Sequence, residues 1–307
     1  MTGEPFDPSD TDLADRSTGL ASDLLRGKVV LVSGGGSGIG RATAWLAARL
    51  GARVIVSGRK AEKLDAVSAA IGARGLSCIG LSADIRQRDT VEHLFDRIAD
   101  RHGGIDILVN SAGGQFPQPA IDYSPKGWRA VIETNLDGTF HMMQCAAQRW
   151  RDQARAGSIV NVVVSPRGLH HVAHTCAARA GVMAFSDAVA VEWAPLGIRV
   201  NCVAPGAIRS EGWKVYPEEV ARRYQNTNPM RAVGEPWDIA EACLYLAGPS
   251  GRFITGETLE VNGGSHLWGE TWTTDKPDHF VQASRAFDPL GSVSPEVPVG
   301  GSDKTKA

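Results

Sequence analysis

The stretch Val29–Gly40, VVLVSGGGSGIG, predicts how the rest of the chain folds. Its first four residues are apolar, as in a buried strand, and a helical pattern follows Gly40. Glycines between a strand and a helix let backbone N–H groups and the positive end of the helix approach a phosphate. The spacing Gly34-x-x-x-Gly38-x-Gly40 is a variant of the dinucleotide-binding fingerprint. We therefore expect a dinucleotide here; the alternative is a flexible glycine loop.

The composition argues against several classes of protein. The 307 residues are 43 % hydrophobic and 21 % charged, which suits one large α/β domain. The formal net charge of −2 gives no electrostatic reason to bind nucleic acid or an anionic membrane, and no apolar run reaches the length of a membrane span. The five cysteines are widely spaced and contain no CxxC motif, so we expect reduced, buried side chains.

Apolar runs alternate with helical patterns along most of the chain. Strands are expected at residues 29–32, 52–57, 76–83, 105–110, 158–164, 198–204 and 257–261, and helices at 41–50, 60–73, 88–102, 125–150, 173–194 and 236–246. The alternation predicts an α/β fold: a single doubly wound, Rossmann-type parallel sheet of about seven strands with helices on both faces. Ligands of such sheets bind at the carboxyl ends of the strands.

The same reading predicts one reductase-type domain between two tails. We expect the domain over residues 23–264 and disordered tails over residues 1–22 and 292–307, which are rich in polar residues, proline and glycine. Residues 265–291 contain too many aromatic side chains for a free tail. This extension is expected to pack on the domain or on a neighbouring subunit.

The end of the second strand indicates which dinucleotide binds. Proteins that prefer NAD usually carry an acidic residue there, which binds the ribose 2′-OH. This chain has Ser57-Gly58-Arg59, and an arginine can bind the 2′-phosphate of NADP(H) through two parallel hydrogen bonds. We therefore predict NADP(H); the alternative is an ordinary surface arginine. The predicted cofactor-binding residues are Gly34, Ser37, Gly38, Ile39, Gly40, Ser57, Arg59, Asp84, Ile85, Asn110, Ala112, Gly113, Arg179, Pro205, Gly206 and Ile208.

Four motifs stand in the order typical of the short-chain dehydrogenase/reductase family, which the chain resembles from about residue 24 to residue 264. They are the glycine turn that begins at Ser33, Asn110-Ser-Ala-Gly113, Asn135 within ETNLDGTF, and Pro205-Gly206. The resemblance implies a nicotinamide-dependent oxidoreductase. It also implies a homo-oligomer, a dimer or a tetramer, that pairs through the helices at 125–150 and 173–194.

The chain departs from that family at the catalytic positions. Family members carry a serine on the fifth strand and then Tyr-x-x-x-Lys, whose tyrosine exchanges a proton with the substrate oxygen. Here the serine position is Val164, with Ser165 beside it, and the other two positions are Thr175 and Arg179. Threonine lacks a proton as acidic as that of a phenol, so carbonyl reduction is poorly served. Reduction of an activated C=C bond mainly needs hydrogen-bond donors for an enolate oxygen.

The predicted catalytic residues are Asn135, Ser165, Thr175 and Arg179. Thr175 and Arg179 are four residues apart and share a helix face, so Arg179 can still hold ribose hydroxyls. Each hydroxyl residue has a local alternative in a turn or a helix cap, and Asn135 has an alternative in helix packing. Gln115 is a further candidate donor to a thioester oxygen; the alternative is a solvated loop residue.

Longer stretches resemble the peroxisomal trans-2-enoyl-CoA reductases, which reduce 2-enoyl thioesters with NADPH and also lack the usual tyrosine and lysine. They include GGQF at 113–116, AARAGV at 177–182 and EWAPLGIRVNCVAPG at 192–206. This resemblance implies NADPH-dependent reduction of the C=C bond of a trans-2-enoyl-CoA-like thioester. That group has a tyrosine where this chain has Met183, and Lys306-Ala307 is not a peroxisomal address. We therefore expect a bacterial, cytoplasmic relative.

Two other functions stay open at this point. The first is an NADP(H)-dependent oxidoreductase of 3-hydroxy/3-keto acyl-CoA, terpenoid or steroid substrates with an atypical proton donor. The second is a catalytically weak nucleotide-binding sensor or scaffold.

Two further segments attract attention. The cluster His170, His171 and His174 lacks a carboxylate or cysteine partner, so no metal site is predicted. His174 is expected to face solvent; the alternative is that it acts as a proton donor. Residues 209–231 are expected to form a mobile lid over the substrate; the alternative is a pair of surface helices.

Overall fold

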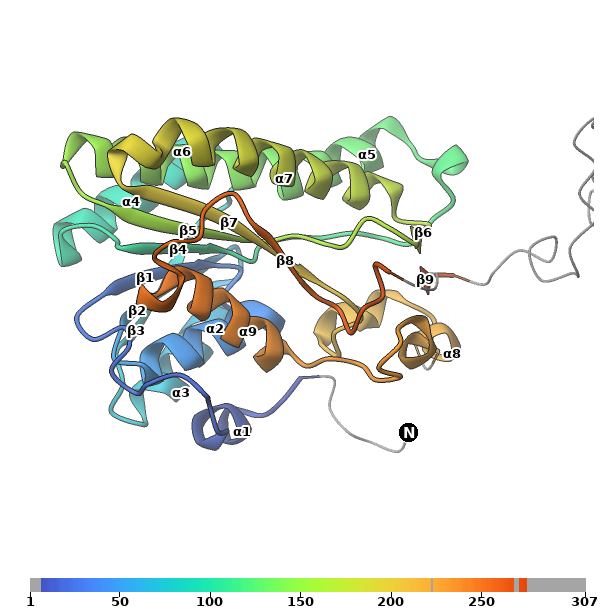
Figure 1. The fold of residues 1–307 in the computed structure, drawn as a ribbon, viewed down its shortest axis with the longest axis horizontal. Helices are drawn as coiled ribbons and strands as arrows, with labels where there is room; N and C mark the ends of the chain where they lie inside the picture. Colours follow the sequence, from blue (N-terminus) through green and yellow to red (C-terminus); the bar gives the residue numbers. More distant parts are fainter. Residues whose placement is uncertain (1–6, 222, 268–270, 275–307) are drawn as a thin grey trace, which may run out of the picture. The chain divides into compact units, whose positions relative to one another are not determined.

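The computed structural model describes residues 7–221, 223–267 and 271–274, which fall in one compact unit (Figure 1). The main sheet in this part of the chain is parallel throughout and has seven strands, as predicted. Their spatial order is β3 (Cys78–Ser82), β2 (Arg53–Gly58), β1 (Val29–Ser33), β4 (Ile107–Asn110), β5 (Gly157–Val162), β7 (Ile198–Pro205) and β8 (Thr258–Val261). The chain order reverses between β1 and β4, which is where ligands bind in doubly wound sheets.

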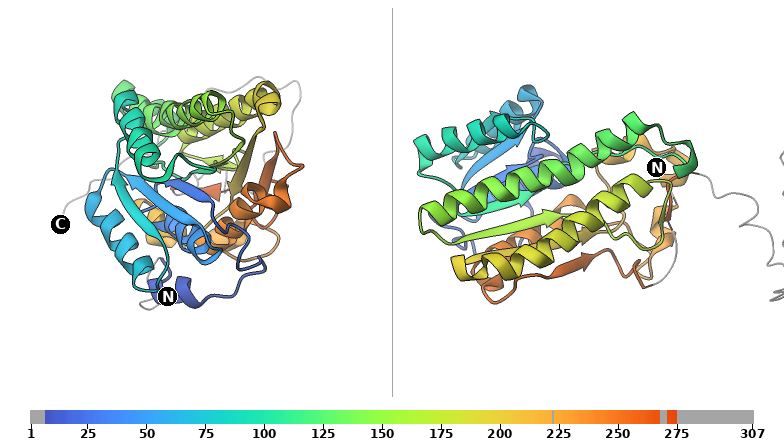
Figure 2. Two further views of the ribbon diagram at one scale, coloured as in Figure 1. Left: turned by 90° about the vertical axis from the view of Figure 1, so that its left-hand side faces the viewer. Right: turned by 90° about the horizontal axis from the view of Figure 1, so that it is seen from above.

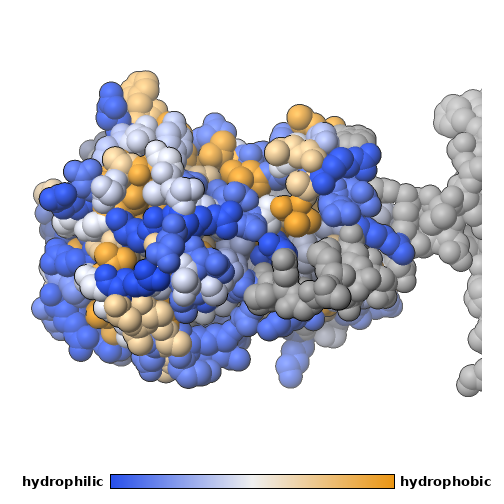
Figure 3. Space-filling model, turned by 90° about the horizontal axis from the view of Figure 1, so that it is seen from below, coloured by the Kyte–Doolittle hydropathy of each residue, from blue (hydrophilic) through white to orange (hydrophobic). Residues whose placement is uncertain are grey.

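Helices cover both faces of the sheet, again as predicted (Figures 1 and 2). One layer holds α4 (Arg88–His102), α5 (Pro125–Ile132), α6 (Gly138–Asp152) and α7 (Ala173–Trp193), and the other holds α2 (Gly38–Arg49), α3 (Ala61–Gly72) and α9 (Pro236–Ala247). Each face of the sheet has its own hydrophobic core, and alternate residues of β1 belong to one or the other. Val30 and Val32 pack with α2 and α9, whereas Leu31 packs with α4 and α6. Figure 3 shows a mainly hydrophilic surface, with small separate hydrophobic groups, on the face seen from below.

The long helix predicted at residues 125–150 is interrupted. A π-helical segment, Glu133–Asp137, lies between α5 and α6 and contains the buried Asn135. Such π segments inside α-helices are rare and occur frequently at functional sites, because the extra residue in the turn re-aims the neighbouring side chains. Here the π segment contains Asn135, which the sequence predicts to be a catalytic residue.

The N-terminal segment differs from the expected disordered tail over residues 1–22. Of these, the structure describes residues 7–22 and places a helix there, α1 (Asp10–Asp15), with Leu13 1 % exposed. A capping box between Ser9 and Asp12 starts the helix. Asp10 Oδ1 accepts hydrogen bonds from Trp45 Nε1 at 2.8 Å and Arg41 Nη1 at 3.2 Å, both on α2. The Ser-x-x-Asp pattern before a leucine is the signal that compositional reading overlooked.

The expected extension over residues 265–291 is described only at residues 265–267 and 271–274. In it, β9 (Thr271–Trp272) pairs in parallel with β6 (Leu169–His170) of the same chain, a small sheet that the sequence did not predict. Thr273 Oγ1 donates to the carbonyl of His170 at 2.8 Å, and the rings of His170 and Trp272 lie 4.5 Å apart. Residues 275–291 and the predicted tail over 292–307 lie outside the described residues. Among the described helices, none is both long and apolar enough to cross a membrane.

Candidate active site

A cleft of about 580 Å³ opens at the carboxyl ends of the main-sheet strands, a volume typical of small-molecule sites. Its walls come from the turn after β1, the ends of β2 and β3, and the loops after β4, β5 and β7. The predicted residues that line it are Gly34, Ser37, Gly38, Ile39, Arg59, Asp84, Ile85, Ala112, Gly113, Asn135, Thr175, Arg179, Pro205 and Ile208.

The glycine turn is held by the backbone of β2. The carbonyl of Ser57 accepts from the N–H groups of Gly34 at 2.7 Å and Gly35 at 3.2 Å. A Cβ on Gly34, whose φ is +71°, would lie 2.7 Å from the backbone nitrogen of Ala112, and one on Gly40 would clash with the carbonyl of Gly34. Ser57 and Gly40 therefore shape the turn from behind and do not line the cleft; that they contact the cofactor stays a prediction.

A carboxylate of the N-terminal segment lies at the start of α2. Asp7 Oδ2 accepts from the backbone N–H of Gly38 at 3.0 Å, and Oδ1 accepts from the N–H of Glu211 at 3.0 Å. Gly38 and Glu211 stand on different walls of the cleft. The first turn of a helix attracts anions through its free N–H groups and its dipole. Asp7 thus holds a position suited to a phosphate.

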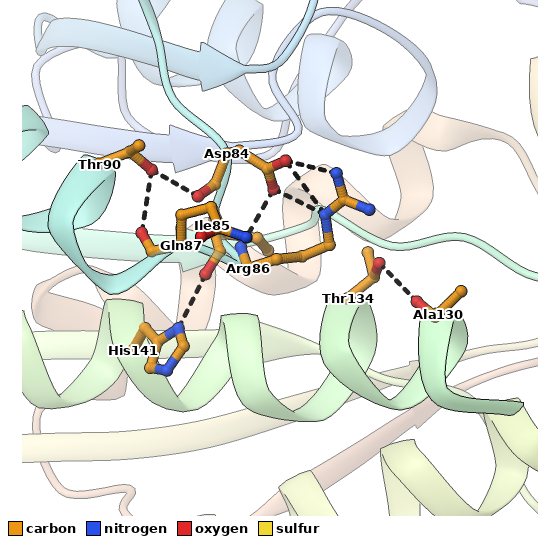
Figure 4. Close-up of polar contacts among 8 residues, drawn as sticks. All are labelled: Asp84, Ile85, Arg86, Gln87, Thr90, Ala130, Thr134 and His141. Atoms are coloured by element: carbon orange, nitrogen blue, oxygen red, sulfur yellow. Dashed lines mark hydrogen bonds and ion pairs between the residues drawn. The ribbon is translucent and has the colours of Figure 1, made fainter. Parts of the chain in front are cut away.

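The wall at the ends of β2 and β3 is rich in cations. Arg59 is exposed and makes no hydrogen bond or ion pair to the described residues, whereas Lys63 Nζ pairs with Glu211 at 2.6 Å. Arg86 holds the carboxylate of Asp84 at 2.5 Å (Figure 4). The hydrogen bonds from Arg86 keep the pKa of Asp84 below its usual range. His141 Nδ1, 2.9 Å from the carbonyl of Ile85, ties the same loop to α6 (Figure 4).

Two side chains clamp the loop after β4. Asn135 Oδ1 accepts from the N–H of Gly114 at 3.1 Å, and its Nδ2 donates to the carbonyl of Gly114 at 2.7 Å. Arg179 Nη2 donates to the carbonyl of Ala112 at 3.0 Å. A Cβ on Gly113 would clash with Arg179 and would lie 2.8 Å from Asn135 Oδ1, so only glycine fits between the two. Both side chains position the loop while lining the cleft.

Buried donors at this end of the cleft have no partner. Thr175 is 2 % exposed and Arg179 is 6 % exposed, yet Thr175 Oγ1 and Arg179 Nη1 bond to none of the described residues. Burial lowers the pKa of Arg179 to about 10, so the guanidinium stays charged at neutral pH. Buried polar groups are nearly always hydrogen-bonded, so these two donors require a polar partner in the cleft, either water or a ligand.

Three other predicted residues lie elsewhere. Asn110 is buried beneath the cleft, where it accepts from Ser33 Oγ at 3.3 Å and donates to Asn161 Oδ1 at 2.9 Å. Ser165 and Gly206 line a second cavity of about 100 Å³, and Val164 takes the place of Ser165 in the cleft wall. Val162, Val163 and Val164 all line the cleft, and Ser165 is the first residue after β5 that lines the second cavity instead.

The segment over residues 209–231 covers this second cavity. It contains two 3₁₀ turns, Glu211–Val215 and Tyr224–Thr227, around the short helix α8 (Glu218–Ala221). Tyr216 accepts a hydrogen bond from Gln115 Nε2, and its ring packs edge-on against Tyr224 at 5.8 Å. Burial raises the pKa of Tyr216 to about 12. That the segment is a mobile lid stays a prediction.

His174 is fully buried, so the expectation that it faces solvent is wrong. Its ring stacks on Tyr123 at 4.5 Å, and Nδ1 accepts from the N–H of Thr175 at 2.7 Å. Burial lowers its pKa, which favours the neutral ring. In the described ranges, no three His, Cys, Asp or Glu side chains gather as metal ligands would.

Several cleft residues were missed by the sequence reasoning: Gly36, Lys60, Lys63, Arg86, Thr134, Ser210 and Glu211. Arg86 and Lys63 had a usable signal, because cations just beyond the ends of β3 and β2 face the same edge of the sheet as Arg59. Ser210 and Glu211 had none, since their place depends on how the chain folds back after β7.

Comparisons with known proteins give a consistent picture. A family profile described as Enoyl-(Acyl carrier protein) reductase matches residues 34–266. The peroxisomal 2,4-dienoyl-CoA reductase of Arabidopsis thaliana is 36 % identical over 89 % of this chain and 95 % of its own. The 3-oxoacyl-[acyl-carrier-protein] reductase FabG of Vibrio cholerae is 37 % identical over 79 % of this chain and 99 % of its own.

Solved structures agree in fold. The citronellol catabolism dehydrogenase AtuB of Pseudomonas aeruginosa matches with a TM-score of 0.73 and 35 % identity, covering 81 % of this chain and 99 % of that one. A variant of actinorhodin polyketide ketoreductase, solved with NADPH, matches with a TM-score of 0.75 and 30 % identity, covering 78 % of this chain and 98 % of that one.

Proposed function

Since the chain belongs to the short-chain dehydrogenase/reductase family and is an oxidoreductase, we propose that it reduces, with NADPH, a C=C bond conjugated to the carbonyl of an acyl thioester. The observation that carries this proposal is the pair Thr175 and Arg179, which lines the cleft where family members have tyrosine and lysine. Thr175 has no acidic proton to give to an alkoxide, and both side chains can donate hydrogen bonds to an oxygen.

The residues of the cleft fit NADP(H). The N–H groups of the glycine turn and the start of α2 suit a pyrophosphate, and Arg59 suits a 2′-phosphate because it is exposed and has no hydrogen-bond or ion-pair partner among the described residues. Arg179, with Nη1 unpaired, suits the hydroxyls of the second ribose. Bound there, the reduced cofactor would supply a hydride.

The chain's own residues then act on the thioester. The free hydroxyl of Thr175 and the amide of Gln115 are the donors available to a carbonyl oxygen, and they matter more as that oxygen gains enolate charge. Val164, in the place of the usual serine, gives the wall beside them an apolar surface. That surface suits an acyl chain and helps to exclude water.

The relatives named as dienoyl-CoA reductases support this reaction class, since reduction of a dienoyl thioester also passes charge to the thioester oxygen. Relatives named FabG, at similar identity, support a second candidate, reduction of a 3-ketoacyl thioester. The narrower resemblance to trans-2-enoyl-CoA reductases, the cytoplasmic location and the oligomeric state stay predictions.

One assay separates the candidates. The protein is mixed with NADPH and, separately, with a trans-2-enoyl-CoA, a 2,4-dienoyl-CoA or a 3-ketoacyl-CoA of equal chain length, and the absorbance of the reduced nicotinamide is followed. Oxidation of NADPH with either unsaturated thioester and not with the keto compound is the expected result. Turnover with the keto compound alone would overturn the proposal. Tight NADPH binding without any turnover would point to a nucleotide sensor.

A further inference from the structure

The cleft offers no ordinary source for the proton that C=C reduction also needs. Among the described residues that line it, none is a tyrosine, a histidine or a cysteine. Its two acids, Asp84 and Glu211, are paired with Arg86 and Lys63, and these hydrogen bonds keep their pKa values below the usual range. Both acids are therefore ionised at neutral pH and cannot donate.

A phenol stands just outside this wall. The hydroxyl of Tyr216 accepts from Gln115 Nε2, and Gln115 lines the cleft. Tyr216 itself lines the second cavity, and Pro205 lines both. The Gln115 side chain therefore links the wall of the cofactor cleft to a hydroxyl whose ring lines the second cavity.

Aromatic packing holds the phenol in this position. Its ring meets Tyr224 edge-on at 5.8 Å, and Tyr224 in turn meets Trp213 edge-on at 5.3 Å. The N–H of Tyr216 donates to the carbonyl of Trp213 at 2.9 Å, which closes the 3₁₀ turn before it. Edge-to-face pairs of this kind contribute specific geometry beyond burial. A fixed ring leaves the hydroxyl little freedom to point away from Gln115.

We propose that the Tyr216 hydroxyl is the proton donor of the reaction. This inference rests on the proposed function. The hydride adds to the far carbon of the conjugated system, and the electrons of the C=C bond move to the thioester oxygen as an enolate. The enolate then re-forms the carbonyl while its α carbon takes the proton of Tyr216, and the phenolate regains a proton from water. Two electrons and two hydrogens are thereby added to the substrate.

The state of the phenol suits this step. With a pKa raised to about 12 by burial, the hydroxyl keeps its proton throughout the neutral range. The α carbon of a thioester enolate is far more basic than a phenolate, so transfer to carbon is downhill. Transfer to an alkoxide is served better by a phenol of lowered pKa, which agrees with the choice of C=C over carbonyl reduction.

The test compares two tyrosines of one cavity. Tyr216→Phe removes only the hydroxyl, and Tyr224→Phe is the matched control, because Tyr224 lines the same cavity and its hydroxyl has no partner among the described residues. On an unsaturated thioester that the wild type reduces, Tyr216→Phe should lose roughly 10²- to 10⁴-fold in kcat, the usual size of general acid catalysis. Its NADPH affinity and melting temperature should match those of Tyr224→Phe, which should stay near wild-type kcat.

A second readout separates chemistry from packing. In D₂O the wild type should place deuterium on one face of the α carbon, and residual product from Tyr216→Phe should carry it on both faces. Full kcat with unchanged facial preference in Tyr216→Phe would overturn the inference and leave the proposed function standing. A wild type that reduces no unsaturated thioester would overturn both, so the two failures are distinguishable.

Discussion

Thr175 and Arg179 occupy the helix positions at which family members carry tyrosine and lysine, so the chemical groups differ while their spacing on the helix is the same. They stand four residues apart on α7, both line the cleft, and both keep a donor atom free of partners in the described chain. Arg179 also stabilises the loop after β4, since it donates a hydrogen bond to the carbonyl of Ala112. Thr175 makes no such side-chain contact, because its hydroxyl bonds to none of the described residues. The two roles can therefore be separated by substitution.

Thr175→Val keeps the volume of the side chain and removes the hydroxyl. If that hydroxyl donates to the enolate oxygen, kcat on the preferred thioester should fall by roughly 10²- to 10³-fold, as for other single oxyanion donors. The melting temperature should not fall, because no hydrogen bond within the described residues is lost. Steady-state kinetics with thermal denaturation checks both expectations; an unchanged kcat would remove Thr175 from the mechanism.

Arg59→Ala tests the choice of cofactor. Loss of charged hydrogen bonds to a 2′-phosphate costs about 1.5–3 kcal/mol, so NADPH should bind roughly 10- to 100-fold more weakly while NADH binding stays nearly constant. Arg53→Ala is the control, since Arg53 is also an exposed arginine but lies at the opposite end of β2. Fluorescence titration of the wild type and both variants with each dinucleotide measures the six dissociation constants. An equal loss of affinity for NADPH and NADH would show that Arg59 does not bind the 2′-phosphate.

At the scale of elements, α1 and the residues before it form a strap along α2. Asp10 bonds to Trp45 and Arg41, Arg49 Nη1 donates to the carbonyl of Leu13 at 3.0 Å, and Asp7 caps the N–H of Gly38. The strap thus ends with a carboxylate at the start of α2, in the place proposed for the pyrophosphate. Two anions cannot share these N–H groups without repulsion.

Asp7→Asn should therefore tighten NADPH binding. The substitution keeps a hydrogen-bonding oxygen near Gly38 and removes the charge, so the dissociation constant should fall roughly 3- to 10-fold, in line with the energy of one charge at a helix terminus. The difference should shrink at high salt, where such interactions are screened. Calorimetry at two ionic strengths provides the measurement. Weaker binding by Asp7→Asn would mean that the strap supports the cofactor instead of opposing it.

The elements also show what sequence alone could reach. The strand, glycine turn and helix of β1 and α2 are one continuous local pattern, so their site was predictable from Val29–Gly40. The contacts of Asp7 were not, because its partners lie 31 and 204 residues away in the chain. Nor could a helical pattern show the π segment at Asn135, since one inserted residue hardly alters the spacing of apolar positions.

At the scale of the whole molecule, the parallel sheet collects strand ends on one edge, which is why widely separated motifs meet in a single cleft. Ser165 is an exception, since it lines the second cavity. The strand β5 ends two residues earlier than the apolar run suggests, and beyond that end the strand period no longer predicts which cavity a side chain faces. The order of the family motifs predicted which loops form the cleft, but it did not predict which side chain after β5 faces it.

The helices α5 and α7 leave apolar side chains at the surface. Trp128 on α5 is 42 % exposed, and Val191 on α7 is 77 % exposed. If the protein pairs through these helices, as the family resemblance implies, Val191→Glu should weaken self-association and shift the protein towards a smaller species, since an unpaired charge in an interface is costly. Light scattering after size exclusion measures the mass. A wild-type protein that is already monomeric would contradict the expected assembly.

The clamps on the loop after β4 have a consequence for how this sequence can vary. Asn135 and Arg179 bond to backbone atoms of Ala112 and Gly114, not to side chains. Most substitutions in that loop would therefore leave the clamps intact, while any side chain at Gly113 would collide with both. The loop can thus change its side chains on either side of Gly113 and keep its backbone in place. Gly113, Asn135 and Arg179 therefore restrict how the sequence of this region can change, more than the other residues of the loop do.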